Sequence, residues 1–297
     1  MTSPGARLRA AMATGMVTAP GACDPFTARL IARAGFDAVY LGGNALGLSL
    51  AKGQPIVTLT ETAAHTSEIV LATDLPLIVD AGAGFGSPVH VLRTVREIEH
   101  AGAAALHIDD QPYPKSPGYH RGDGGLAQVE EMVKRLRAAV QARRDPDLLL
   151  IARTDALRVS GPDEAVARAR AYAAAGADAI MILDLGPEQA CTMQAQLPGI
   201  PLVWIGGVVP PVPETLALAK AGFAIALYPF NTIAAIAGAV STLWETLRDT
   251  GRIDQPDALL RHMRTELAEI AGMADYWDLE DDLAGKPRRG SARSDGQ

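Results

Sequence analysis

The chain has 297 residues, of which 48% are hydrophobic and 21% charged, and its formal net charge is −7. This composition excludes disorder over most of the chain, and the acidic balance argues against nucleic acid or an anionic membrane as the main partner. The two cysteines, Cys23 and Cys191, exclude a disulfide framework and a thiolate metal site, and they suit a reducing cytoplasm. We find no signal peptide in residues 1–13 and no apolar run of the roughly 18 residues that span a membrane.

Eight short apolar segments alternate with segments of helical period, and each is typical of a strand covered on both faces. The predicted strands are Met16–Ala19, Ala38–Leu41, Leu77–Asp80, Ala104–Ile108, Leu148–Arg153, Ala179–Leu183, Leu202–Ile205 and Ala224–Leu227. The clearest predicted helices between them are Pro25–Ala34, Thr60–Ala72, Pro88–Ala101, Ala127–Arg143 and Asp163–Ala175. Several helical segments are followed by glycine, as at Gly35 and Gly222, which indicates a helix stop with positive φ.

Eight strand–helix pairs predict a (β/α)8 TIM-type barrel with additional C-terminal helices at Thr232–Arg248 and Ala258–Met273. The alternative is an open doubly wound sheet, but no Gly-x-Gly-x-x-Gly motif opens the first helix. No internal linker is evident, so we expect residues 1–284 to form one domain. The Gly/Ser/Arg-rich residues 285–297 are expected to be a disordered tail.

Charged side chains stand at the expected carboxyl ends of the strands, where barrel enzymes carry their chemistry. Asp80 and Asp109 end consecutive strands and Arg153 ends the next one, which is the makeup of a hard-cation site beside an anion clamp. Since side chains alternate along a strand, His107 is expected one layer below Asp109, where a hydrogen-bonded core histidine is the simplest interpretation. For other acidic residues near strand ends, helix caps and turns are the competing interpretation: Asp24, Asp110 and Asp155.

Two loops add to this site. The loop 80–86 has glycines at alternate positions, which allow a close backbone approach to a ligand, although alone this is a weak phosphate signal. The segment Gln111–Gly125 is long and rich in Pro and Gly, which predicts a mobile lid; an ordinary surface excursion is the alternative. Lys115, His120 and Arg121 lie on this segment and would bring positive charge to a bound anion.

Several motifs between about residues 15 and 240 resemble the isocitrate lyase / phosphoenolpyruvate mutase superfamily. Gly21–Ala28 is similar to its opening segment, and Val79–Gly86 to its Asp-Ala-Asp-Thr-Gly-Tyr-Gly loop. His107–Gln111, followed by Pro114-Lys115, resembles its Ile-Glu-Asp-Gln…Pro-Lys segment. Ala152–Ala156, with the helix that follows, is the most specific match.

The resemblance implies a (β/α)8 barrel, usually a homotetramer that exchanges a C-terminal helix, with Mg²⁺ and a 2-oxo or 2-hydroxy carboxylate substrate. It implies that Asp80 is the metal-side aspartate, and that Asp109 stands at the family's glutamate. It also implies that Arg153 clamps the substrate carboxylate. Backbone donors would come from Gly42 and Gly43, and the expected substrate-binding set is completed by three further residues: Asn44, Lys115 and His120.

The chain departs from the family at several polar positions. The lid lacks the lyase cysteine acid, since Lys115-Ser-Pro-Gly-Tyr-His120 stands in its place, and isocitrate and methylisocitrate cleavage are therefore disfavoured. The other departures are Gly82 for the second aspartate, Asp109 for glutamate, Leu183 for the residue ending strand six, Ile205 near the asparagine after strand seven, Cys23 for tyrosine, and Gly53–Ile56 where an aspartate is expected.

The first hypothesis is a Mg²⁺-dependent carbon–carbon lyase or decarboxylase that acts on a small 2-oxo or 2-hydroxy acid through an enolate, with Asp80, Asp109 and Arg153 as its catalytic residues. Asp80 and Asp109 could still hold Mg²⁺, because this ion keeps several waters and needs only one or two carboxylates. The alternatives are a phosphoenolpyruvate mutase or phosphonopyruvate-type enzyme, a divergent member with metal-independent chemistry on a larger substrate, and a non-catalytic binding protein.

Overall fold

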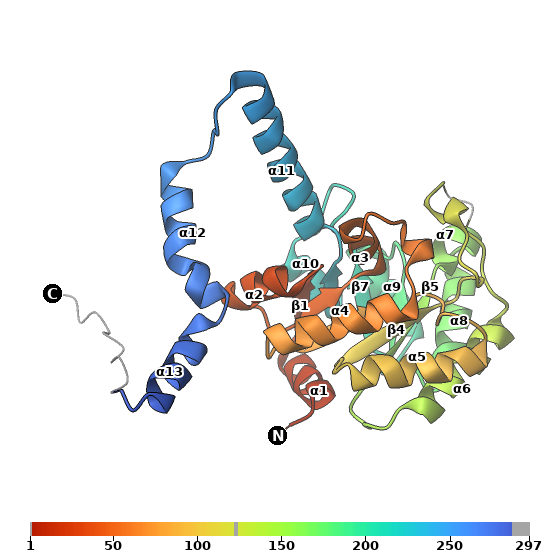
Figure 1. Cartoon of the computed structure of the whole chain (residues 1–297). Coiled ribbons are helices and arrows are strands. Elements are labelled where there is room, and N and C mark those ends of the chain that lie inside the picture. The colour runs from red at the N-terminus through yellow and green to blue at the C-terminus, as the bar shows by residue number, and fades with distance from the viewer. Residues whose placement is uncertain (1, 122–123, 287–297) are drawn as a thin grey trace. The chain divides into compact units, whose positions relative to one another are not determined.

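Eight parallel strands, all within residues 17–228, form one sheet (Figure 1) in a computed structural model that describes residues 2–121 and 124–286. Neighbouring strands pair in the order β1-β8-β7-β6-β5-β4-β3-β2. A parallel bridge between Gly21 and Tyr40 joins the two ends of this series, so the sheet closes on itself. The strands are β1 Val17–Pro20, β2 Val39–Leu41, β3 Leu77–Asp80, β4 Ala105–Asp109, β5 Leu149–Thr154, β6 Ala179–Ile182, β7 Leu202–Ile205 and β8 Phe223–Tyr228.

The predicted (β/α)8 barrel is confirmed, with all eight strands within one residue of their expected bounds. The helices that follow the strands lie outside this barrel (Figure 1). The helices are α1 Pro4–Thr14, α2 Pro25–Arg33, α3 Gly43–Ser49, α4 Leu59–Ala72, α5 Pro88–His100, α6 Val129–Ala142, α7 Ala156–Ser160, α8 Pro162–Ala174, α9 Pro187–Gln196, α10 Thr215–Lys220, α11 Asn231–Thr250, α12 Asp257–Ile270 and α13 Met273–Leu283, with 3-10 turns η1 Gln54–Ile56 and η2 Pro117–Arg121.

The helix boundaries follow local sequence signals. Gly35 and Gly222 have φ of +83° and +88°, as expected for glycines that end a helix before the next strand. Gly272, at φ +69°, likewise ends α12, so the helix predicted over Ala258–Met273 stops early and α13 begins separately. The eight predicted pairs include helices after β2, β6 and β7, but no bounds are predicted for α3, α9 or α10, and α1 is not predicted, since these helices are short or only weakly amphipathic.

The core has two layers because side chains alternate between the two faces of each strand. One cluster fills the barrel interior with residues such as Ile78, Ile151 and Ile225, and Leu8 of α1 belongs to it. A second, larger cluster packs the outer strand faces, such as Val79 and Leu150, against the surrounding helices. This alternation decides which strand-end residues project into the barrel mouth.

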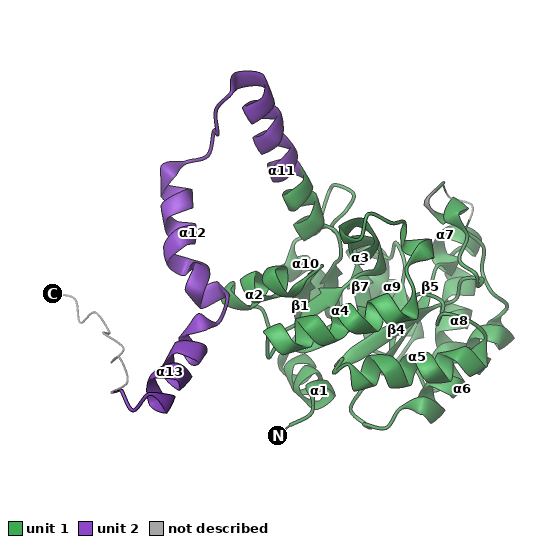
Figure 2. Cartoon of the chain, viewed as in Figure 1, with its two compact units in different colours: residues 1–237 green, residues 238–297 purple. Residues whose placement is uncertain are grey.

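The chain divides into two compact units, residues 1–237 and 238–297 (Figure 2). The boundary falls within α11, and the single domain expected over 1–284 stays a prediction. Residues 287–297, most of the predicted tail, lie outside the described residues. Among the helices described, none has both the length and the apolar character needed to cross a membrane.

Candidate active site

The inward-facing residues at the carboxyl ends of the strands come from adjacent positions around the barrel. Asp80 ends β3, Asp109 ends β4, and Asp109 pairs in register with Arg153 of β5. All three side chains are nearly buried, with exposures of 8%, 0% and 6%. The structure therefore brings together the charged residues that the sequence predicts as catalytic.

A histidine lies between the two aspartates. His107 Nδ1 is 3.0 Å from Asp109 Oδ1, and its Nε2 is 3.6 Å from Asp80 Oδ1 and 2.9 Å from the Tyr40 hydroxyl. Burial opposes ionisation of Asp109, but the charges of Arg153 and Lys115 with His107 hold the pKa of this carboxyl well below its ordinary value. Because an ionised carboxylate only accepts hydrogen bonds, we assign the imidazole proton to Nδ1, which donates to Asp109, so that the Tyr40 hydroxyl donates to Nε2.

Tyr40 keeps its proton in this arrangement. Burial, reinforced by the charges of Asp80 and Asp109, raises the pKa of this phenol well above its ordinary value. The chain Tyr40–His107–Asp109 is thus a continuous line of hydrogen bonds beneath the barrel mouth. His107 is the buried, hydrogen-bonded histidine expected from strand alternation, and it connects both aspartates.

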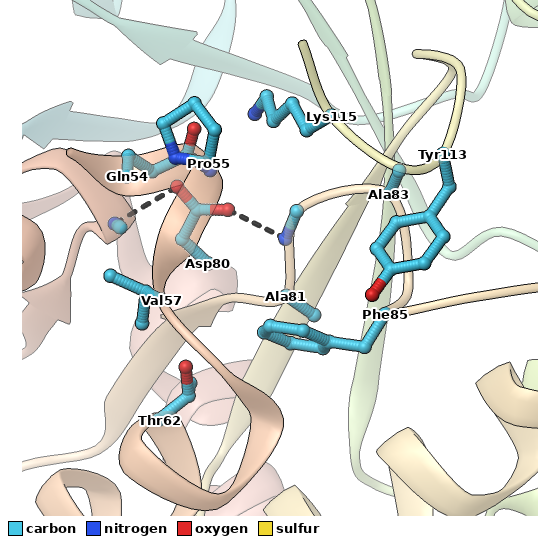
Figure 3. A pocket seen from close by; sticks show the side chains of 12 residues that line it. Gln54, Pro55, Val57, Thr62, Asp80, Ala81, Ala83, Phe85, Tyr113 and Lys115 are labelled. Carbon is cyan, nitrogen blue, oxygen red and sulfur yellow. Dashed lines mark hydrogen bonds between the residues drawn. The ribbon is translucent and has the colours of Figure 1, made fainter. Parts of the chain in front are cut away.

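Two backbone N–H groups hold the Asp80 carboxylate (Figure 3). Gly43 N donates to Oδ2 at 2.9 Å, and Gly82 N donates to Oδ1 at 2.8 Å. A Cβ atom at Gly43 would lie only 2.8 Å from Asp80 Oδ2, so a side chain there would displace the carboxylate. The backbone donor expected from Gly43 is therefore directed at Asp80, while Gly42 precedes α3 and Asn44 lies on its first turn.

Gln54 of η1 lies beside this carboxylate (Figure 3). Its side chain is buried, with 9% exposed, and its Oε1 atom has no hydrogen-bond partner among the described residues. A small cavity of about 40 Å³ is lined by Gln54, Asp80 and Lys115. Since a buried carbonyl oxygen without a donor is costly, this position favours a cation or a water.

Arg153 contacts three partners at once. Its Nε and Nη2 donate to the two carboxylate oxygens of Asp155 at 2.9 and 3.4 Å, and Nη2 also donates to the Tyr119 hydroxyl at 2.7 Å. Its Nη1 lies 3.8 Å from Asp109 Oδ2. The bidentate edge of the guanidinium is thus used on the barrel rim, and Nη1 is the group that faces the acidic cluster.

The segment Gln111–Gly125 folds over the charged residues through two side chains. Lys115 Nζ donates to Asp109 Oδ2 at 3.2 Å and lies 4.8 Å from the centre of the Tyr119 ring. Tyr119 in turn contacts Arg153. Residues 122 and 123 and the side chain of His120 lie outside what the structure describes, so the predicted role of His120 stays a prediction.

Exchange of backbone amides tests the lid. With oxalate and Mg²⁺ added, we expect slower hydrogen exchange over residues 113–121 than in the free protein, because a bound anion adds partners for Lys115. The exchange of α5 amides, outside the barrel, is the internal control. Equal protection of the segment in both states, with binding confirmed by calorimetry, would contradict a mobile lid.

Asp110, next to the acidic cluster, serves the scaffold. Its Oδ2 accepts from Thr154 Oγ1 at 2.6 Å, Tyr172 OH at 2.9 Å and Arg168 Nη1 at 3.0 Å, and Oδ1 accepts from Asp155 N at 3.1 Å. These bonds connect the ends of β4 and β5 to α8. Asp24 is likewise structural, because it caps α2 by accepting from Thr27 N.

A larger cavity of about 510 Å³ opens on the other side of the mouth. Its charged or polar wall includes Tyr40, Asp80, Arg153 and the predicted substrate-binding residue Asn44. Its remaining wall is mainly apolar and follows β6, β7 and β8; it includes Leu183, Trp204, Ile205, Pro229 and Phe230. The polar residues that the family resemblance suggests at positions 183 and 205 are thus replaced by an apolar surface.

Sequence reasoning placed Asp80, Asp109 and Arg153 together and named Asp155 among the residues at strand ends, but it gave no role to Tyr40 or Gln54. Tyr40 lies in β2, and the alternation of side chains along the strand turns it toward the barrel interior. The one signal for Gln54 was that Gly53–Ile56 stands where the family resemblance suggests an aspartate; the contact itself depends on how the three-residue turn η1 packs.

The sequence model of the family described as phosphoenolpyruvate phosphomutase matches residues 8–248. The chain belongs to the phosphoenolpyruvate mutase / isocitrate lyase superfamily. Among curated relatives, a 2,3-dimethylmalate lyase of Eubacterium barkeri is 41% identical over 79% of this chain and 82% of its own. A 2-methylisocitrate lyase of Aeropyrum pernix is 38% identical over 94% of this chain and 90% of its own.

Solved structures of the superfamily agree with this membership. The structure of a phosphonopyruvate hydrolase, in complex with oxalate and Mg²⁺, superposes with a TM-score of 0.84 at 32% identity. It covers 94% of this chain, which itself covers 98% of the hydrolase. The chain is therefore a superfamily enzyme, with carbon–carbon lyases among its relatives.

Proposed function

We propose that the protein is a Mg²⁺-dependent carbon–carbon lyase that cleaves a 2-oxo or 2-hydroxy carboxylic acid through an enolate. The observation that carries the proposal is the cluster of Asp80, His107 and Asp109, whose ligand atoms lie within 4.8 Å of one another, beside the guanidinium of Arg153. The named activities of the relatives support it: they are lyases of 2,3-dimethylmalate and of 2-methylisocitrate.

The residues fit a hard divalent cation. Asp80 and Asp109 would supply carboxylate oxygens, and the partnerless Oε1 of Gln54 would supply an amide oxygen in the small cavity that Gln54 and Asp80 line. When bound, Mg²⁺ acts as a Lewis acid on the oxygens of the acid. His107 holds the Asp109 carboxylate in place through Nδ1.

The remaining charged groups stabilise the negative charge that develops on the substrate. Arg153 Nη1 and Lys115 Nζ both face the Asp109 side of the mouth, where they can pair with a carboxylate or an enolate oxygen. Tyr40 holds a proton at its hydroxyl next to the same cavity. The segment bearing Lys115 and Tyr119 covers part of this site, since the side chains of Lys115 and Arg153 are only 8% and 7% exposed.

Product analysis tests the activity. Candidate acids, first selected by a thermal-shift screen with and without Mg²⁺, include 2,3-dimethylmalate, oxaloacetate and 2-methylisocitrate. We expect NMR to detect a 2-oxo acid or a shorter carboxylate from at least one of them, and only with the metal. Binding of several acids without any bond cleavage would reject the lyase proposal and favour a binding protein.

Three substitutions at the metal side should change Mg²⁺ affinity, two by lowering it and one by raising it. Asp80→Ala should abolish Mg²⁺ binding, and Asp109→Ala should weaken it about tenfold or more, roughly 1.4 kcal/mol. Gly82→Asp should strengthen it by about tenfold, because aspartate tolerates φ near the +50° of Gly82 and a Cβ there meets Gln54 Nε2 at 3.7 Å.

Calorimetry on the three variants measures these changes. Glu97→Ala on the outer face of α5 is the matched control, since it removes a carboxylate far from the mouth. Absence of Mg²⁺ binding to the wild-type protein at millimolar metal would remove the metal from the mechanism and leave metal-independent chemistry as the leading hypothesis.

A phosphonopyruvate-type reaction is the second candidate, because the phosphonopyruvate hydrolase aligns over nearly its full length. Lys115, only 8% exposed, would supply a cation for the phosphoryl oxygens. Release of phosphate from phosphonopyruvate, or its conversion to phosphoenolpyruvate, would identify this reaction in the same screen.

We further propose a cytoplasmic homo-oligomer, a tetramer by family resemblance. Its support is the apolar surface of α12 and α13, which carry exposed side chains at Leu259, Leu260, Leu267, Tyr276, Trp277, Leu279 and Leu283. Such faces are usually covered in an assembled protein. Light scattering coupled to gel filtration should give a mass of about four chains, and a monomer would overturn this proposal.

A further inference from the structure

The mouth of the barrel has a charged half and an apolar half. Asp80, Asp109 and Arg153 come from β3, β4 and β5, as described above. Around the rest of the ring, Leu183 directly follows β6, its N–H bonding to Thr154 O at 2.9 Å, and Ile205 ends β7. Pro229 and Phe230 follow β8 and line the same 510 Å³ cavity. One ligand in this cavity would therefore contact both halves.

The apolar wall is held firmly. Trp204 is 5% exposed and packs edge-on against Tyr228, with ring centres 5.1 Å apart. A Cβ atom at Gly206 would lie 2.4 Å from the indole ring, so the absence of a side chain there makes room for Trp204. The apolar wall is therefore formed by a well-packed Trp204, and it is not simply a gap where polar side chains are absent.

The cavity is large for a small acid. Its volume of about 510 Å³ falls within the range of roughly 300–1,000 Å³ that is typical of sites for drug-sized ligands. A three-carbon oxo acid has about six non-hydrogen atoms and would fill only part of it. Much of the remainder lies against the side chains of Leu183, Trp204, Ile205 and Phe230, where a second polar end of a substrate would lose its hydrogen bonds to water.

The charged groups at the outer edge do not change this picture. Arg158 and Asp184 line the cavity, but their side chains are 48% and 55% exposed. They lie 3.8 Å from each other, and Arg158 is also 3.8 Å from Asp155. Because Arg158 and Asp184 are paired and exposed to solvent, they form the outer edge of the cavity and do not offer a binding position for a second substrate carboxylate.

We propose that the substrate is an amphipathic acid, whose oxo- or hydroxy-carboxylate head lies at Arg153 and whose apolar substituent, of roughly five to eight carbon atoms, packs on Leu183, Trp204 and Ile205. The substituent is a branched alkyl or aryl group. This inference rests on the proposed function only for the nature of the head group.

Binding of matched 2-oxo acids tests the inference without requiring turnover. Titration calorimetry in the presence of Mg²⁺ compares pyruvate, 2-oxohexanoate and 4-phenyl-2-oxobutanoate on the full chain. We expect affinity to rise about fourfold per buried methylene group, and the phenyl acid to bind at least about thirtyfold tighter than pyruvate. Equal or weaker binding of the larger acids would overturn the inference.

Substitutions in the apolar wall test whether these residues cause the preference for larger acids. Leu183→Gln and Ile205→Asn should each reduce the affinity ratio of the phenyl acid to pyruvate by about tenfold, because they place unpaired polar groups against the substituent. Leu71→Gln, at a residue 83% exposed on α4, is the matched control and should leave the ratio unchanged. Melting curves check that each variant is folded, and two variants at separate strand ends guard against loss of one. An unchanged ratio in both folded variants would also overturn the inference.

The outcome separates this inference from the lyase proposal. Tight binding of apolar acids with no cleavage of any acid keeps the amphipathic ligand and rejects the lyase. Efficient cleavage of small acids, with no gain in kcat/KM or affinity from an apolar substituent, keeps the lyase and rejects the amphipathic substrate.

Discussion

Arg153→Lys is expected to lower turnover by about tenfold to a thousandfold, on the order of 1.5–4 kcal/mol in the transition state. Lysine keeps the positive charge but loses the planar fork, so it cannot hold Asp155 with two bonds and still present Nη1 toward Asp109. The melting temperature should change little. Both quantities are measured on one variant, with the acid that the screen identifies as substrate.

A second substitution separates binding from support of the rim. Asp155→Asn weakens the contact of Arg153 with the rim and leaves the guanidinium intact. If Arg153 only stabilises the barrel rim, Asp155→Asn should have the same effect as Arg153→Lys. Both variants should then have a lower melting temperature and near-normal kinetics. A destabilised but fully active Arg153→Lys protein would rule out the carboxylate clamp.

Asp110→Ala should give the largest loss of stability, about 3–5 kcal/mol, because it leaves the buried guanidinium of Arg168 and the hydroxyls of Thr154 and Tyr172 without their shared acceptor. For a domain of this size, that loss corresponds to a fall of about 6–20 °C in melting temperature. Thermal unfolding followed by circular dichroism measures it.

The matched control is Glu97→Ala, which breaks an exposed ion pair with Arg93. That variant should shift stability by less than about 1 kcal/mol. Equal shifts in the two variants would mean that the four donors on Asp110 contribute little, and that the ends of β4 and β5 are held to α8 by apolar packing instead.

The parts of the fold that could be predicted from sequence are those fixed by short-range periodicity. Each strand is a run of apolar residues whose alternation sends Asp80, Asp109 and Arg153 to the inner face, so their meeting follows from the closed sheet. Contacts made by loops could not be predicted in this way. The bonds of Lys115 to Asp109 and of Tyr119 to Arg153 depend on how residues 111–121 fold back over the mouth.

The same limit applies to roles within the site. The sequence predicts that Arg153 lies at the end of β5. The partner of each guanidinium nitrogen depends on residues that are distant in the chain, such as Tyr119 and Asp109. Gln54 is 26 residues before Asp80, and it lies beside Asp80 because η1 packs against α3. Its orphaned oxygen is a property of the folded structure, and no local pattern indicates it.

In the closed position of the segment that bears Lys115, side chains of the protein make hydrogen bonds that a bound ligand would have to replace. Lys115 donates to the Asp109 carboxylate, which a cation would use as a ligand. The Tyr119 hydroxyl accepts from Arg153 Nη2, which a substrate carboxylate would use as a donor. If only about one molecule in a hundred has these contacts open at a given moment, the measured dissociation constant is about a hundredfold weaker than that of the open site. An assay at low substrate concentration would then underreport an acid that fits the cavity well. Loosening the segment would increase apparent affinity while exposing the enolate to water.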